Sequence, residues 1–550
     1  MTNHQPRPNA RFQIWMPLAL AVVLVLGMLI GGRLQQVAPA VSINNMDEAS
    51  QIWGQGTIEE LIRYVEAKYV DSTDRRALTE AAINTILNKL DPHSSYIPAE
   101  DLAAVNDQLE GNFDGIGVEF LMLDDTIVIV SPMVGGPSET AGILAGDKIV
   151  QIGDSIVVGH GLKTEDIINM LRGEKGTPVK VGVLRFNEKK IRHFTVIRDK
   201  IPVHSVEVSY MLNKHTGYIK INRFSANTYE EFMKGLEILH GKGLKNLVLD
   251  LRYNPGGYLQ QATNMLSQMF SEKDKLLVYT EGRTVNRTEY KTTGRAMYDI
   301  GNIIVLIDEG SASASEIIAG AIQDHDRGLI VGRRSFGKGL VQEQYRLSDG
   351  SALRLTVARY YTPSGRSIQK PYKDNEAYDD DVSERYETGE VFFADKTVVK
   401  DSTRYYTTGG HVVYGGGGIM PDVFVPIDSA QLNDYYLSLR THVSPFIFNY
   451  MQQHESSFKD YQLNSFRSNY YVSDDLYNRF TDYALSKGVK KNAKGAAIAK
   501  KEIKHFIKAR IARFLFDEEG FYVVWNDADH VVQKAIELLG NPDPIAAVKK

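Results

Sequence analysis

Residues 303–321 read IIVLIDEGSASASEIIAGA, and this stretch decides the fold class. Residues 303–307 are all aliphatic, which is typical of a strand buried on both faces of a parallel sheet. Small and polar residues follow, and from Glu316 to Ile322 apolar residues recur at helical spacing. A strand, a short turn and a helix in this order form the repeating unit of an α/β fold. The stretch therefore predicts a buried parallel strand, a serine-rich turn and a covering helix.

The same pattern extends on both sides of this stretch. Residues 247–251 read LVLDL and predict a second buried parallel strand, followed by the glycine-containing loop RYNPGG. From residue 202 to residue 428 strands and helices alternate, so we expect one α/β core over this range. The acidic, tyrosine-containing residues 374–390 look like a surface insertion in that core.

Different patterns flank the core. Residues 33–109 carry apolar side chains at helical spacing, clearest in 58–65 and 78–90, and predict a helical N-terminal region. Residues 110–201 contain short apolar runs punctuated by glycine, which predict a small, mostly β domain inserted before the core. Residues 429–550 predict a helical, aromatic-rich C-terminal extension.

Composition excludes several classes of protein. The chain has 550 residues, which is too long for one hydrophobic core and favours several domains. Its formal charge of −5 argues against a nucleic-acid partner, which requires a basic surface. The absence of cysteine excludes disulfides and zinc–thiolate sites. The lysine-rich segment 487–513 is interpreted as a solvated helix face, with contact to anionic lipid as the alternative.

The N-terminus has the pattern of a membrane anchor. Residues 14–32 are apolar and long enough to cross a bilayer, and Arg7 and Arg11 precede them. Basic residues before the span predict that residues 1–13 stay in the cytoplasm and that the remainder is exported, to the periplasm in a cell with two membranes. A signal peptide cleaved near Ala40 is the alternative.

The glycine-rich residues 332–339, GRRSFGKG, resemble a phosphate-binding loop but do not satisfy its requirements. The position after the lysine is Gly339, where a nucleotide-binding loop needs Ser or Thr for magnesium. A strand-like run follows, whereas that loop must open a helix. A nucleotide-hydrolysing site is therefore rejected.

Two other nucleophile patterns are also weak. Ser-x-x-Lys occurs in the chain at Ser335, Ser367 and Ser456, and the first of these lies in a sequence that forms helices poorly. A G-x-S-x-G motif is absent. His325 follows Ser313 by twelve residues, but it is interpreted as a polar residue that closes a helix.

Residues 135–150, GGPSETAGILAGDKIV, resemble the PDZ-domain signature found in proteases. Residues 114–118, DGIGV, resemble the matching carboxylate-binding loop. Glycines there let consecutive N–H groups converge on an anion, and a peptide then adds as a strand along the neighbouring edge. The predicted peptide-binding residues are Gly115, Ile116, Gly117 and Val118.

A larger set of motifs resembles the C-terminal processing (tail-specific) peptidases, from about residue 91 to residue 426. In order, these motifs are DLRYNPGG at 250–257, EGSASASEIIAGA at 309–321, FGKGLVQ at 336–342, YTPSG at 361–365 and GIMPD at 418–422. The resemblance implies that Ser313 is the nucleophile, Lys338 the general base and Gln342 its support. It also implies an α/β core like the crotonase and Clp-protease folds, with no metal or cofactor.

Elementary chemistry agrees with these roles. The turn before a helix exposes the Ser313 hydroxyl, and the helix N-terminus directs N–H groups toward developing negative charge. The N–H of Ala314, with that of Gly256 or Gly257, would form the oxyanion hole. On a strand, Lys338 and residue 342 would face the same way. The competing interpretation is that the serines only cap a helix.

The sequence therefore predicts an exported serine endopeptidase that selects protein C-termini. Its expected partners are protein or peptide substrates with accessible C-termini and, through the N-terminal helix, the membrane; self-association is suggested by the helical flanks. Arg172, which follows a predicted PDZ helix, is a candidate for coupling tail binding to the active site. A catalytically inactive PDZ scaffold is the alternative function.

Overall fold

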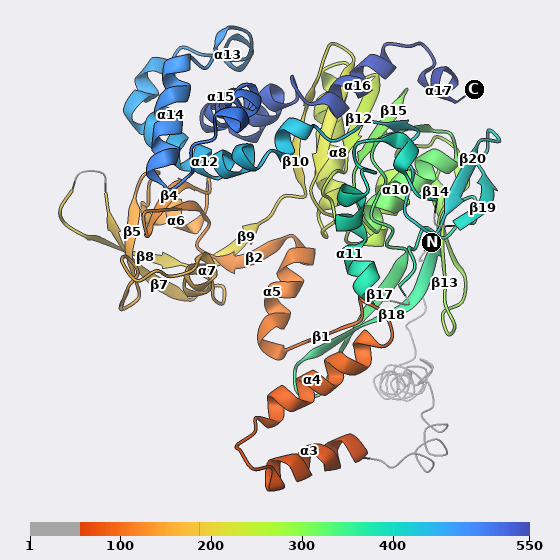
Figure 1. Ribbon diagram of the computed structural model, residues 1–550, viewed down its shortest axis with the longest axis horizontal. Coiled ribbons are helices and arrows are strands. Elements are labelled where there is room, and N and C mark those ends of the chain that lie inside the picture. The colour runs from red at the N-terminus through yellow and green to blue at the C-terminus, as the bar shows by residue number, and fades with distance from the viewer. Residues whose placement is uncertain (1–55, 186–187, 373–374, 400, 550) are drawn as a thin grey trace, which may run out of the picture. The chain divides into compact units, whose positions relative to one another are not determined.

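The computed structural model describes residues 56–549 except 186–187, 373–374 and 400 (Figure 1). The chain divides into two compact units, residues 1–83 and residues 84–550. The expected membrane span at 14–32 lies outside the described residues. Among the residues that are described, none of the helices has the length and apolar character needed to cross a membrane.

The first unit contains helical structure in its described part. Helix α3 spans Thr57–Lys68, and α4 spans Arg75–Asn88 and continues into the second unit. The Arg75 guanidinium bonds to two carboxylates of α3, those of Glu59 and Glu66. The helices predicted at 58–65 and 78–90 are confirmed as α3 and α4.

The second unit is built on a six-stranded sheet, in the order β10-β11-β12-β15-β16-β21. Only β10 and β11 are antiparallel; every other neighbouring pair is parallel. The parallel strands predicted at 247–251 and 303–307 are β12 and β15, which lie side by side. The bounds are β10 Val206–Met211, β11 Thr216–Ile221, β12 Asn246–Asp250, β15 Ile303–Ile307, β16 Gly328–Gly332 and β21 Val423–Phe424.

Helices cover both faces of this sheet, which explains why its strands are aliphatic throughout. Alternate residues of a strand point to opposite faces. Val305 packs with α8 (Thr228–Gly241), α9 (Leu259–Ser267) and α10 (Ala314–Asp324). Ile304 packs on the other face with α16 (His530–Leu539), so the C-terminal extension completes the core (Figure 1).

A second sheet carries the FGKGLVQ motif. Its order is β1-β18-β13-β14, and β17 pairs with β18. The bounds are β1 Ser95–Ile97, β13 Lys273–Glu281, β14 Thr288–Thr293, β17 Leu340–Arg346 and β18 Ala352–Tyr361. A separate hairpin pairs β19 (Asp401–Tyr406) with β20 (Val412–Gly415), and a 3₁₀ turn, η2, spans Ala394–Lys396.

Residues 112–202 form the predicted small β-rich region. Five strands follow the order β3-β4-β5-β7-β8, β6 pairs with β5, and β2 pairs with β9. Helix α5 (Ala99–Glu110) leads into this region. The other bounds are β2 Asn112–Gly115, β3 Val118–Leu123, β4 Thr126–Pro132, α6 Pro137–Ala141, β5 Lys148–Ile152, β6 Ser155–Ile156, α7 Thr164–Leu171, β7 Pro178–Leu184, β8 Arg192–Ile197 and β9 Asp199–Pro202.

The C-terminal extension is helical, as predicted, and part of it has an aromatic-rich core of its own. The long helix α15 (Ala493–Trp525) is interrupted at Phe516 and Asp517, whose backbone is not helical. The remaining elements are η3 Ser429–Leu432, α12 Asp434–His454, η4 Glu455–Phe458, α13 Leu463–Asn469, α14 Asp474–Ser486 and α17 Pro544–Val548.

The prediction of a surface segment at 374–390 holds for one face of it only. Helix α11 spans Asn375–Glu387, and Tyr378, Asp381 and Arg385 are buried. The buried charges are paired: Arg385 bonds to Asp381 at 2.7 Å, and Glu390, just after the helix, bonds to Arg334 at 2.5 Å. A count of acidic residues could not reveal these partners.

Candidate active site

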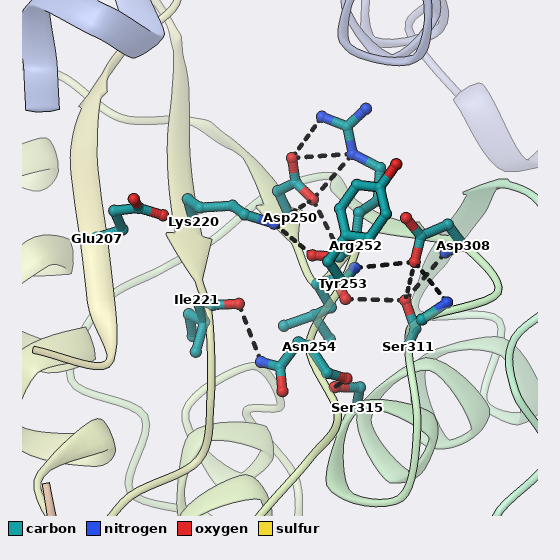
Figure 2. A network of polar contacts seen from close by, with 12 residues as sticks. Glu207, Lys220, Ile221, Asp250, Arg252, Tyr253, Asn254, Asp308, Ser311 and Ser315 are labelled. Carbon is teal, nitrogen blue, oxygen red and sulfur yellow. Dashed lines mark hydrogen bonds and ion pairs between the residues drawn. The ribbon is translucent and has the colours of Figure 1, made fainter. Parts of the chain in front are cut away.

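Ser313 stands out from the two serines beside it. The Oγ of Ser311 donates to the carbonyl of Leu251 at 2.8 Å, and the Oγ of Ser315 donates to the carbonyl of Asn254 at 2.9 Å (Figure 2). Both of those serines are buried. Ser313 is partly exposed immediately before α10, with φ 55° and ψ −113°. This backbone conformation is costly for a residue with a side chain, and such strained residues cluster at functional sites.

Only half of a helix-capping arrangement is present at this serine. The N–H of Ser313 donates to the Glu316 carboxylate at 2.8 Å, but the serine side chain forms no capping hydrogen bond. The interpretation of Ser313 as a helix cap therefore does not account for its hydroxyl.

The loop after β12 is held against the Ser313 turn by a polar network (Figure 2). The N–H of Tyr253 donates to Asp308 at 2.9 Å, and the side-chain amide of Asn254 donates to the carbonyl of Ile221 at 2.9 Å. Arg252 bonds to Asp250 and reaches Asp529 in the C-terminal extension at 2.9 Å. The loop is thus held by three residues outside it, Asp308, Ile221 and Asp529.

The same loop brings Gly256 against the Ser313 turn. A Cβ added at Gly256 would lie 2.8 Å from the Cβ of Ser313 and 2.9 Å from the nitrogen of Ala314, so only glycine allows this approach. The N–H of Gly256 donates to the side chain of Asn254 at 2.9 Å. In the described part of the chain, the N–H groups of Gly257 and Ala314 have no acceptor. Of the two predicted glycines, Gly257 is the one with a free donor.

Lys338 lies beside the predicted glutamine. Its Nζ donates to Oε1 of Gln342 at 3.1 Å, and Nε2 of Gln342 donates to the carbonyl of His93 at 2.5 Å. The expectation that both residues share one strand is wrong, because Lys338 precedes β17 and the pairing register shifts beside Gln342. The contact is made by the loop rather than by strand alternation.

The surroundings of Lys338 favour its neutral form. Burial lowers the pKa of Lys338, and the nearby Arg354 guanidinium lowers it further. Asp91 and Glu316 act in the opposite direction. Burial, with the Lys338 charge, also lowers the pKa of His93 to about 4, so this imidazole adds no positive charge at neutral pH.

Glu316 connects the serine turn to the lysine loop, which the sequence analysis did not foresee. Its Oε2 accepts from the N–H of Ser313 at 2.8 Å and from the N–H of Lys338 at 2.9 Å. Its Oε1 accepts from the hydroxyl of Ser335 at 2.5 Å and from the N–H of Gly337 at 2.7 Å. Burial raises the pKa of Glu316 to about 7. In the sequence, the signal for a contact with the serine turn was that Glu316 lies three residues after Ser313.

Asp91 and His93 were also missed, because they belong to none of the motifs found in the sequence. The Asp91 carboxylate accepts from the N–H of His93 and from the N–H of Ser94, both at 2.8 Å, and from the Thr356 hydroxyl at 3.1 Å. This cluster fixes the carbonyl to which Gln342 donates.

A cavity of about 530 Å³ joins these groups. Ser313, Lys338, Gln342, Gly256 and Gly257 all lie in its wall. In the described chain, the hydroxyl of Ser313 and the amine of Lys338 share this cavity without a direct hydrogen bond. The other lining residues are Val105, Gln108, Leu109, Arg223, Pro255, Tyr258, Leu259, Gln260, Tyr290, Ile317, Leu340, Val341, Arg354 and Tyr360.

The rejected patterns do not form sites. His325 closes α10 and contacts the carbonyl of Leu276 at 2.6 Å. The 332–339 loop leads into strand β17 rather than into a helix. Lys370, the partner of the Ser367 pattern, is buried and donates to the carbonyl of Tyr378 at 2.8 Å.

The predicted tail-binding loop lies between β2 and β3. Gly117 has φ +67°, a conformation that favours glycine. The carbonyl of Ile116 accepts from both the N–H and the hydroxyl of Ser138, which fixes the loop. Within the described residues, the N–H groups of Ile116 and Gly117 have no acceptor. Strand β3, which follows at Val118, is an edge of its sheet.

Arg172 lies at the end of α7 and contacts the helix that leads to the cavity. Its guanidinium lies 3.6 Å from the Asp107 carboxylate of α5 and over the ring of Phe113, at 4.6 Å from the centroid. Gln108 and Leu109, the next residues of α5, line the cavity.

Comparison with known proteins identifies three segments. Residues 215–376 match peptidase family S41, residues 115–197 match the PDZ domain, and residues 435–517 match a family of unknown function. The chain is 35% identical over 442 residues to a carboxy-terminal-processing protease of Bartonella bacilliformis, covering 78% of this chain and 97% of the relative.

Two further proteins are similar to this chain. Carboxy-terminal processing protease CtpB of Bacillus subtilis is 37% identical over 318 residues, covering 57% of this chain and 65% of the relative. A solved photosystem II D1 C-terminal processing protease is 32% identical, with a TM-score of 0.32, and the match covers 56% of this chain and 82% of that one. The chain therefore belongs to the carboxy-terminal processing proteases of peptidase family S41, serine-type enzymes that carry a PDZ domain.

Proposed function

We propose that Ser313 and Lys338 form a catalytic dyad that cleaves proteins through an acyl-enzyme, and that the PDZ domain selects substrates by their C-terminal tails. The observation that carries the proposal is the cavity whose wall holds a strained, partly exposed serine, a partly buried lysine and Gly257 with its free N–H. Ala314, the residue after the serine, has a second free N–H. Each group has a role that its environment favours.

The chemical steps follow from these groups. The neutral amine of Lys338 accepts the hydroxyl proton while Oγ of Ser313 attacks the scissile carbonyl carbon. The N–H groups of Ala314 and Gly257 donate to the oxyanion that forms. The lysine ammonium then protonates the departing amine, which leaves an ester on Ser313. Water, deprotonated by the same amine, releases the new C-terminus and restores the serine.

Gln342 orients the lysine amine without favouring its protonated form. Its Oε1 accepts from Lys338 and orients the amine, and a neutral amide does not stabilise the ammonium as a carboxylate would. The dyad hydrogen bond must still form, because the serine hydroxyl and the lysine amine are not bonded in this structure. Such bonds commonly tighten only when substrate is present.

Tail selection by the PDZ domain is supported by the free N–H groups of Ile116 and Gly117 and by the free edge of β3. A terminal carboxylate would accept from these N–H groups while the peptide backbone pairs with β3. The same loop includes Gly115 and ends at Val118.

Coupling between the two sites would run through Arg172. Its contact with Asp107 joins the end of the PDZ helix α7 to α5, whose next residues line the cavity. A peptide that moves α7 would therefore change the position of α5 beside the active site.

We further propose that residues 14–32 anchor the protein in the cytoplasmic membrane and that the catalytic part lies outside the cytoplasm. The apolar length of this segment and the basic residues before it support the proposal.

A fluorophosphonate probe tests the dyad directly. The wild type should acquire one adduct at Ser313 by intact mass, and Ser313→Ala should acquire none there. Lys338→Ala should label far more slowly at neutral pH, because the hydroxyl then lacks its base. Equal labelling rates for Lys338→Ala and wild type would remove the lysine from the mechanism.

A further inference from the structure

Helix α11 contacts the lysine loop through one buried guanidinium. Arg385 donates to three successive carbonyls, those of Arg334 at 3.0 Å, Ser335 at 2.9 Å and Phe336 at 3.2 Å. Lys338 follows two residues later. A guanidinium has five N–H donors in a fixed plane, so it can hold several carbonyls in one arrangement.

The other side of the loop is held by Glu316, which accepts from the N–H groups of Gly337 and Lys338. Arg385 therefore satisfies the carbonyls before the lysine while Glu316 satisfies the N–H groups at it. Two buried charges of opposite sign fix the backbone from which the Lys338 side chain extends.

A second route from α11 reaches the lysine through its amide support. The hydroxyl of Tyr378 lies 2.6 Å from Nε2 of His93, and the two rings meet edge to face. The carbonyl of His93 accepts from Gln342, whose Oε1 accepts from Lys338. Tyr378 is thus connected to the amine through His93 and Gln342.

A third contact reaches the serine side of the site. The hydroxyl of Tyr386 donates to Glu309 at 2.6 Å, and Glu309 is paired with Arg333 at 2.8 Å. Glu309 begins the turn that leads to Ser313. Helix α11 therefore contacts three parts of the site. These are the segment before Ser313, the loop before Lys338, and His93, whose carbonyl accepts from Gln342.

We propose that α11 is a positioning element for the general base, with Arg385 and Tyr378 as its positioning residues. Neither residue lies in the 215–376 segment that matches the peptidase family. The inference rests on the proposed role of Lys338 as base. It assigns a function to the stretch that composition alone marks as a surface insertion.

The physical consequence concerns hydration of the amine. The charged groups that face Lys338 are Arg354 from β18, Glu316 from α10 and Asp91, and His93 lies beside it. None of them belongs to α11, so α11 acts on Lys338 by holding the loop that keeps it buried. A looser loop would admit water and favour the ammonium form.

Two substitutions separate this role from a change of charge. Arg385→Lys keeps the charge but cannot span three carbonyls, and Tyr378→Phe keeps the ring but loses the contact with His93. Glu384→Ala, on the exposed side of α11, is the control. Arg385→Ala is less informative, because it removes one partner of the buried Asp381, which also pairs with Lys370, together with the carbonyl contacts.

The first measurement is the pH dependence of fluorophosphonate labelling of Ser313 in the full-length protein. For Arg385→Lys and Tyr378→Phe, the profile should move to higher pH. A rise of about one unit in the pKa of Lys338 lowers labelling about tenfold at neutral pH, and the loss should shrink at high pH. Glu384→Ala should match the wild type.

The second measurement does not depend on catalysis. Reductive ¹³C-methylation of Ser313→Ala protein allows the Lys338 resonance, identified by its absence in Lys338→Arg, to be titrated by NMR. Arg385→Lys and Tyr378→Phe should both raise its midpoint in this background. Unchanged midpoints in correctly folded variants would overturn the role of α11. A shifted midpoint with pH-independent labelling would instead overturn Lys338 as the base.

Discussion

Nζ of Lys338 lies 3.1 Å from Oε1 of Gln342, and this contact pairs a partly buried amine with a neutral acceptor. A buried lysine beside a carboxylate would be held as the ammonium, which cannot accept a proton. Whether residue 342 carries an amide or a carboxylate therefore decides the direction in which it shifts the pKa of Lys338. Burial lowers the pKa of Lys338, and Gln342 orients the amine without reversing that shift.

We expect proteolysis to rise with pH along one ionisation that lies below that of free lysine. Lys338→Arg should be nearly inactive at every pH, because arginine does not give up its proton. Gln342→Glu should move the ionisation to higher pH and lower activity at neutral pH. The pH–rate profiles of the three proteins on one peptide substrate check this. Wild-type rates from Lys338→Arg would show that the base lies elsewhere.

The same shift has a consequence for stability. Because the folded pKa lies below the unfolded value, the unfolded chain binds the extra proton between the two values. The destabilising contribution of Lys338 is therefore complete at low pH and disappears as pH rises through this window. Lys338→Met should gain stability mainly below the window, as measured by urea unfolding at several pH values.

Ser313→Ala and Lys338→Ala should each reduce proteolysis at least about a thousandfold, and the double variant should be no worse, because the pair acts as one unit. His325→Ala should retain full activity, since its ring contacts the carbonyl of Leu276 rather than the cavity. The measurement is cleavage of an unstructured protein by purified variants with matched thermal melting curves.

Glu316→Gln should impair both catalysis and stability. An amide has one acceptor oxygen, so two of the four donors around Glu316 lose their partner. Hydrogen bonds to a charged group contribute about 1.5–3 kcal/mol each, and the loss should approach about 3 kcal/mol. Glu384→Gln makes the same change at an exposed site and should be neutral. Unfolding free energies and kcat together test the link between serine turn and lysine loop.

The sequence predicted the parts of this protein whose signals are local. The aliphatic runs at 247–251 and 303–307 specify buried parallel strands, and they are β12 and β15. The turn at Ser313 followed from a strand, small residues and a helix in succession. The lysine and glutamine were assigned by resemblance to a family, and the structure brings them together at 3.1 Å.

The parts that were missed depend on contacts between distant segments. The position of Glu316 after Ser313 was a signal for the serine turn, but its contact with the lysine loop was not, because the two loops meet only in the fold. Helix α11 looked like a surface insertion because its acidic residues suggested solvent, whereas Asp381 is paired with Arg385. Which glycine has a free N–H depended on one side-chain contact, that of Asn254 with Gly256.

The proposed membrane anchor leads to a separate prediction. A reporter that functions only outside the cytoplasm should be active when fused after Lys550, and the protein should remain with membranes after a salt wash. Deletion of residues 14–32 should release it to the soluble fraction. A mature N-terminus near Val41 would instead show that the segment is a cleaved signal peptide, in agreement with the small residues at Ala38 and Ala40.

Tail recognition should depend on the terminal carboxylate. A substrate with a free C-terminus should be cleaved faster than its amidated form, because an amide cannot replace the anion at the N–H groups of Ile116 and Gly117. If Arg172 couples this site to the cavity, Arg172→Ala should remove most of that difference, a change of about tenfold. A short peptide that does not reach the PDZ domain should be cleaved at the wild-type rate.

The partner of Arg172 provides the decisive comparison. Asp107→Ala should have the same effect, and the double variant should be no worse than Arg172→Ala alone, since both changes remove the ion pair between the two residues. Lys175→Ala removes a cation three residues away that pairs with Asp199 instead, and it should leave tail selection intact. Additive losses in the double variant would mean that Arg172 and Asp107 act separately. Coupling would then have to run through another contact between α7 and α5.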